Sequence, residues 1–257
     1  MGLAKLAKLA KLAKRRVIRS IPFVAATITF LAGAISLFGG ANDLSIIDTP
    51  KTYASYKGEV RFDFTIYDMG GILSSATLGL SEAFFLGVYF DVGQLIGSEE
   101  AQVAQPGVLA RFRITDGSTF VPPIAIGYGY FMKGEVNKVD GVTVSGFYAV
   151  ASAGYFLFRN EQTFVYGLRY PIVPFDYSKP ENMSVFIGTD IELSPSFGVK
   201  AEIENIRFEK DWWEETFYNF GFAFNVVDVL AIAIEFKYSP SIDRIVRLLR
   251  IGYSTQF

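Results

Sequence analysis

The stretch Glu59–Tyr67, "EVRFDFTIY", alternates strictly between two kinds of side chain. Val60, Phe62, Phe64 and Ile66 fall on one face of an extended chain, and the charged and polar residues fall on the other. Aromatic and β-branched residues with a period of two are typical of β-strands. The stretch therefore predicts a strand whose two faces meet different environments.

The same alternation continues through the rest of the chain and predicts about twelve strands with no intervening helix. We expect Pro122-Pro123 to mark a bulge or the start of a strand, because proline cannot donate to a hydrogen-bonded ladder. The expected strands are 58–67, 72–80, 83–92, 107–115, 119–130, 143–158, 163–170, 184–193, 197–204, 216–226, 229–238 and 246–257.

The connections between these strands alternate between short and long. Short links are expected at 81–82, 115–118, 159–162, 194–196 and 227–228, and the first of the other links, 68–71, is also short. Longer links are expected at 93–106, 131–142, 171–183, 205–215 and 239–245. Short turns on one side and long loops on the other are typical of bacterial outer-membrane barrels. We predict an all-β fold, a single antiparallel up-and-down transmembrane β-barrel of about twelve strands.

Composition restricts the function. The chain has 257 residues, a mean hydropathy of +0.29, and neither Cys nor His. Without His there is no Ser-His-Asp triad, and the commonest general base and transition-metal ligand are missing. Without Cys there is no disulfide or thiolate chemistry. We predict a protein that is not an enzyme and that has no cofactor and no metal site.

The first 41 residues have the organisation of a signal peptide. Seven basic residues and no acid precede or flank the uncharged run 21–38, and Gly39-Gly40-Ala41 supplies small residues for cleavage after Ala41. We predict an N-terminal signal helix over 1–41 and a barrel domain over 42–257; an uncleaved anchor is the alternative. The remaining 17 basic and 26 acidic residues give the barrel domain a net charge of −9, which argues against nucleic acid as a partner.

The last predicted strand also alternates, with Leu249, Ile251, Tyr253, Thr255 and Phe257 on one face. An aromatic final residue after this spacing resembles the terminal signal of bacterial outer-membrane β-barrel proteins. The resemblance implies that Tyr253 and Phe257 form an assembly signal for the barrel-assembly machinery. It also implies the cell outer membrane as the location and outer-membrane lipid as a partner.

The faces opposite the aromatic residues carry charges of both signs, and we predict that they line the lumen. Closure of the barrel pairs the first strand with the last, so Arg61 and Asp63 are expected near Arg250. The candidate lumen or selectivity residues are Glu59, Arg61, Asp63, Arg111, Arg113, Arg169, Asp190, Glu192, Lys200, Glu202, Glu204, Glu235, Lys237 and Arg250.

Three functions fit this pattern. The first is a narrow channel or envelope-transport component for a small polar or charged solute, with selectivity set by the lumen charges. The second is a structural or scaffolding barrel whose lumen is closed by salt bridges. The third is a secreted soluble barrel that binds an apolar ligand.

Aromatic residues near strand ends are expected to form interfacial belts. These interfacial aromatics are Tyr130, Tyr170, Trp212, Trp213 and Tyr218. Stacking of Trp212-Trp213 on a sugar ligand is an alternative role for that pair.

Overall fold

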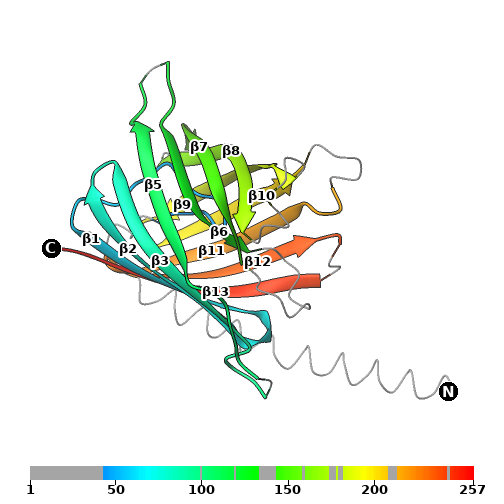
Figure 1. Ribbon diagram of the computed structural model, residues 1–257. Helices are drawn as coiled ribbons and strands as arrows, with labels where there is room; N and C mark the ends of the chain where they lie inside the picture. The colour runs from blue at the N-terminus through cyan, green and yellow to red at the C-terminus, as the bar shows by residue number, and fades with distance from the viewer. Residues whose placement is uncertain are drawn as a thin grey trace. The chain divides into compact units, whose positions relative to one another are not determined.

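The strand predicted from "EVRFDFTIY" is β1 (Glu59–Tyr67), and it hydrogen-bonds to a strand on each side in a computed structural model of the protein. One neighbour is β2 (Gly71–Ser81) and the other is β13 (Arg244–Gln256), the last strand of the chain. The pairing of first and last strands closes the sheet into a barrel, as Figure 1 shows. The structure describes residues 43–98, 100–118, 120–132, 143–157, 160–173, 178, 182–207, 213–241 and 244–257.

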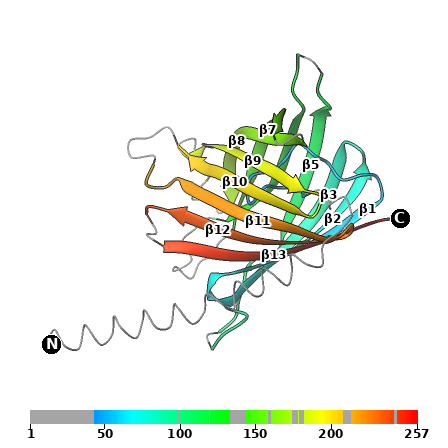
Figure 2. The same ribbon diagram turned by 180° about the vertical axis from the view of Figure 1, so that it is seen from behind.

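Within these residues, twelve long antiparallel strands form the closed ring, which confirms the predicted fold. The remaining members are β3 (Phe84–Gly93), β5 (Gly107–Thr115), β6 (Ile124–Met132), β7 (Thr143–Leu157), β8 (Asn160–Val173), β9 (Ser184–Ser194), β10 (Phe197–Ile206), β11 (Phe217–Val227) and β12 (Leu230–Ser239). Each pairs with its neighbours in the chain, seen from behind in Figure 2. A two-residue strand, β4 (Gln102–Val103), adds to the end of β3 and was not predicted.

The connections follow the predicted alternation with two corrections, one of which is that the β12–β13 link, predicted to be long at 239–245, covers only 240–243. Two residues join β2 to β3, β9 to β10, and β11 to β12. The link from β5 to β6 covers 116–123 and is not tight, because β6 begins only after Pro122-Pro123. The proline pair therefore precedes a strand start, as expected. The short first link is a 3₁₀ turn, η1 (Asp68–Gly70), in which Met69 has a φ of 65°.

The two faces of the barrel wall differ as the alternation predicts. On β1, Phe62 and Phe64 are 40% and 45% exposed on the outer surface, whereas Arg61 and Thr65 are buried. On β12, Ile234 and Tyr238 are exposed, and the charged residues between them are buried inside. The outer surface is thus apolar and the lumen polar, which is the reverse of a soluble barrel built to hold an apolar ligand.

The predicted signal helix over 1–41 and the cleavage after Ala41 lie outside the described residues. In the part of the chain that the structure describes, no helix is long and apolar enough to cross a membrane.

Candidate functional site

The segment before the first strand lies inside the barrel. We call residues 43–56 the plug segment. Its backbone folds back on itself, because the Ile46 amide donates to the Thr49 carbonyl (2.8 Å) and the Lys51 amide donates to the Leu44 carbonyl (3.0 Å). Ile46 and Ile47 are fully buried and belong to the apolar cluster of the lumen. No pattern in the sequence indicated where this segment lies, and its contacts with the wall define the candidate site.

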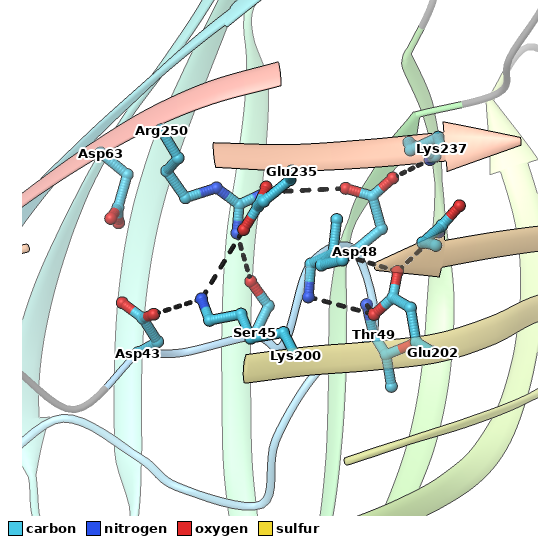
Figure 3. Close-up of polar contacts among 12 residues, drawn as sticks. Asp43, Ser45, Asp48, Thr49, Asp63, Lys200, Glu202, Glu235, Lys237 and Arg250 are labelled. Carbon is cyan, nitrogen blue, oxygen red and sulfur yellow. Dashed lines mark hydrogen bonds and ion pairs between the residues drawn. The ribbon is translucent and has the colours of Figure 1, made fainter. Parts of the chain in front are cut away.

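Glu202 on β10 binds three consecutive backbone amides of the plug segment. Its carboxylate accepts from Ile47 (3.0 Å), Asp48 (2.9 Å) and Thr49 (3.0 Å), and also from the Asn219 side chain (2.8 Å). Adjacent amides that converge on one carboxylate form an anion-binding nest, and hydrogen bonds to a charged acceptor are stronger than neutral ones. Figure 3 shows Glu202 and the plug residues Asp48 and Thr49 beside it. Glu202 therefore fixes the turn of the plug segment against the wall.

Asp48 in the plug segment faces a group of wall cations. Its carboxylate forms an ion pair with Lys237 on β12 and lies 3.8 Å from the Arg250 guanidinium on β13. Arg169 on β8 donates to the Asp48 carbonyl oxygen at 2.8 Å. Although burial opposes ionisation, Lys237 and then Arg250 hold the pKa of the Asp48 carboxyl below its usual range. With its amide bound to Glu202 on β10, this one plug residue contacts four separate strands.

Asp43 makes the second charged attachment. Its two carboxylate oxygens lie 2.5 Å from Lys200 Nζ on β10 and 2.6 Å from Arg61 Nη2 on β1. Burial opposes ionisation here too, but Lys200 and Arg61 keep the pKa of Asp43 below its usual range. Lys51 adds a third attachment, with Nζ 2.6 Å from the Asp190 carboxylate on β9.

Glu59 links the plug segment to the first strand. Its carboxylate accepts from the Tyr53 hydroxyl and from the Tyr56 amide, both at 2.9 Å. Further along the segment, the Thr52 and Ser152 hydroxyls are 2.7 Å apart and connect it to β7. All of these attachments are hydrogen bonds or ion pairs, and in the part of the chain that the structure describes the plug segment pairs with no strand of the barrel.

The wall charges also pair with each other. Arg169 and Lys237 lie 2.9 and 2.8 Å from the Glu204 carboxylate. Glu235 lies between Arg250 (3.4 Å) and Lys200 (3.6 Å). Pairing offsets part of the cost of burying these charges, although both Glu235 oxygens lack a hydrogen-bond donor among the described residues.

Most of the predicted lumen residues meet in this network, with two qualifications. Arg113 pairs with Asp116 at 2.6 Å near the β5–β6 link, and the exposed Glu192 lies near the β9–β10 turn, so both sit at the rim. Arg61 and Asp63 pair with each other at 2.9 Å rather than with Arg250. The strand register explains this, because Asp63 faces Gly252 and Thr65 faces Arg250.

The aromatic residues at the strand ends divide into two groups. Tyr218 and Trp213 are 40% and 49% exposed, and Tyr170 is half-buried on the outer wall. Tyr130, however, lines the lumen and its ring packs against Tyr89 at 4.8 Å, so its assignment as an interfacial aromatic is wrong. Gly129 and Gly146 face each other on the adjacent strands. Trp212 lies outside the described residues.

A cavity of about 80 Å³ remains between the plug segment and the wall. Its lining includes four arginines, Arg61, Arg111, Arg169 and Arg250, together with three plug and wall carboxylates. The plug segment and the wall thus border a polar space within the described lumen.

No described protein family and no curated protein matches this chain. Among solved structures, the outer-membrane protein Omp33 of Acinetobacter baumannii aligns with a TM-score of 0.45 and 10% identity, over 79% of this chain and 98% of its own. The KdgM porin aligns with a TM-score of 0.49 and 11% identity, over 77% and 99%. The structure of the KdgM porin in complex with disordered oligogalacturonate aligns with a TM-score of 0.45 and 10% identity, over 77% of this chain and 99% of its own. At these values the function has to be argued from the lumen itself.

Proposed function

We propose that the protein is an outer-membrane β-barrel that conducts small polar or charged solutes, and that the plug segment is its gate. The apolar outer face supports insertion into lipid, and the charged lumen supports a water-filled path. One observation carries the proposal. Within the described residues, the segment that closes the lumen forms no ladder with a strand of the barrel, so it can leave without breaking the strand ladder.

We further propose that residues 1–41 direct export and are removed after Ala41, and that Tyr253 and Phe257 serve in barrel assembly. The support for both steps is the sequence pattern. Tyr253 is 41% exposed on the outer wall of β13, where an assembly factor and later the lipid can reach it.

An engineered disulfide tests the gate. The chain has no Cys, and the Thr52 and Ser152 hydroxyl oxygens are 2.7 Å apart, so Thr52→Cys with Ser152→Cys gives one possible cross-link. We expect single-channel steps from the double variant in planar bilayers under a reducing agent, and their loss after oxidation. The Thr52→Cys single variant is the control and should not respond to the oxidant.

A permanently closed structural barrel is the second candidate, favoured by the extensive pairing of the lumen charges. Absence of steps from the reduced double variant would support it and overturn the channel. Steps that persist when mass spectrometry shows a complete disulfide would leave the channel intact but reject the plug segment as its gate.

A further inference from the structure

A row of lumen-facing residues crosses four neighbouring strands beside the cavity. Phe85 on β3 faces Arg111 on β5, which faces Gly127 on β6, which faces Tyr148 on β7. The guanidinium carbon of Arg111 lies 5.1 Å from the centre of the Phe85 ring and 5.6 Å from that of Tyr148. Two aromatic rings therefore hold this cation in a fixed position by cation–π contact.

Gly127 provides the space for this arrangement. A Cβ atom at this position would lie 2.3 Å from the Tyr148 hydroxyl oxygen and 2.4 Å from its ring. Because glycine has no side chain, the Tyr148 ring can extend over β6 and bring its hydroxyl to Arg111 Nε, at 2.7 Å. The sequence thus keeps open a cradle around the guanidinium.

Arg111 differs from the other arginines of the cavity in its partners. Arg61, Arg169 and Arg250 each form an ion pair with a carboxylate. Arg111 is only 4% exposed, yet its contacts in the described residues are Tyr148, the Tyr53 carbonyl oxygen (2.7 Å) and the two rings. A guanidinium has five N–H donors, so it can still bind an acceptor through its fork.

The rest of the cavity offers no carboxylate to balance that charge. Its three acids already pair with other cations: Asp43 with Lys200 and Arg61, Asp63 with Arg61, and Asp48 with Lys237. Thr77 also lines the cavity, and its buried hydroxyl has no hydrogen-bond partner among the described residues. The volume of about 80 Å³ exceeds the roughly 10–15 Å³ that one water molecule needs.

We propose that this cavity binds a small monovalent oxyanion, a carboxylate or phosphate group, with Arg111 as the main ligand. The bound anion neutralises the buried guanidinium, and its oxygens accept hydrogen bonds from Arg111 and Thr77. The site exists while the plug segment is seated. It therefore does not depend on conductance, and it can fail or succeed independently of the proposed channel.

Binding can be measured by NMR on the full barrel in detergent micelles, labelled with ¹⁵N-arginine. The resonance of the Arg111 Nε–H group is identified by its absence from an Arg111→Met variant. We expect sodium acetate, added at constant ionic strength, to shift this resonance with a saturable curve. Monovalent phosphate, tested at a pH of about 5, is expected to do the same if the site takes any oxyanion; saturation by acetate alone restricts it to carboxylates.

Three variants make the result specific. Arg113→Met, on the same strand but at the rim, should leave the affinity for acetate unchanged. Arg111→Lys keeps the charge without the fork; because it lacks the Arg111 resonance, its binding is followed on the Nε–H group of Arg250, which also lines the cavity. Gly127→Ala keeps Arg111 but fills the cradle. Each should weaken binding about tenfold or more. A shift that grows linearly with acetate without saturating, or an affinity that Gly127→Ala and Arg111→Lys leave unchanged in folded protein, would overturn the site.

Discussion

Replacing Glu202 with Gln tests how the plug segment is held. In the structure each carboxylate oxygen accepts two hydrogen bonds: one from Asp48 and Asn219, the other from Ile47 and Thr49. Gln is nearly isosteric but has one oxygen and one NH₂ group. Whichever way the amide is turned, its NH₂ group faces two N–H donors and cannot accept from them.

The expected magnitude follows from that count. Two hydrogen bonds to a charged acceptor are lost, each contributing about 1.5–3 kcal/mol, so the seated plug loses about 3–6 kcal/mol relative to the released one. At about 1.4 kcal/mol per tenfold change, the equilibrium between released and seated plug rises roughly a hundredfold to ten-thousandfold. The strand ladder is unaffected, so the barrel should stay folded.

Limited proteolysis gives the readout. Lys51 lies in the plug segment, where its side chain pairs with Asp190 and is 15% exposed. Trypsin should therefore cut after Lys51 much faster in Glu202→Gln than in the wild type, and mass spectrometry identifies the new end at Thr52. Glu82→Gln, at an exposed position in the β2–β3 turn, is the matched control. Equal protection of Lys51 in Glu202→Gln and the wild type would refute the amide nest as the main attachment.

Three further predictions concern charge and lipid. The pKa values of Asp43 and Asp48 are lowered in the folded protein, so their stabilisation of the plug is complete above the ordinary aspartate pKa of about 3.9 and is lost only as the pH falls through the lower folded pKa values. Pepsin cleavage of the plug segment should therefore begin only well below pH 4. Release of the plug already at pH 5–6 would contradict this. Lys237→Met leaves Asp48 and Glu204 without their closest cation and should lower the free energy of unfolding by about 3–5 kcal/mol, measured by urea denaturation against the exposed Lys57→Met. Phe64→Lys on the outer face should lower the free energy of unfolding in lipid vesicles by about 2–4 kcal/mol. Phe120→Lys is the control, because Phe120 is 94% exposed in the β5–β6 link and its replacement should change this free energy little. Equal losses in the two variants would argue against a lipid-facing wall at Phe64.

The strands and their facing were predictable because they depend on local information. A period of two places Phe62 and Arg61 on opposite faces wherever the strand lies, and the structure confirms an apolar outside and a charged inside. The β5–β6 link was predicted too short because the pattern of 119–130 was continued through Pro122-Pro123. Tyr130 was predicted to lie outside because it is near a strand end, but its ring packs against Tyr89 in the lumen.

The plug segment could not be predicted in the same way. Residues 43–56 have no periodic pattern, and their partners are far away in the chain: Glu202 is 155 residues from Ile47, and Lys237 is 189 residues from Asp48. The sequence did show many charged residues on the faces predicted to line the lumen, and such charges need partners when they are buried. The predicted accounts of these charges were an open, charge-lined channel or a lumen closed by salt bridges, and neither gave a reason to bring an N-terminal segment inside.

The sequence by itself thus determined the class of this protein: a twelve-stranded barrel with aromatic residues outside and charges of both signs inside, because alternation along a strand is a local property. The tertiary structure decided whether that lumen is open. Asp43 and Asp48 pair with Arg61, Lys200 and Lys237 only after closure brings β1, β10 and β12 around one axis. Closure also leaves Arg111 as the lumen cation without a carboxylate partner in the described residues, which no pattern in the chain distinguishes from its neighbours.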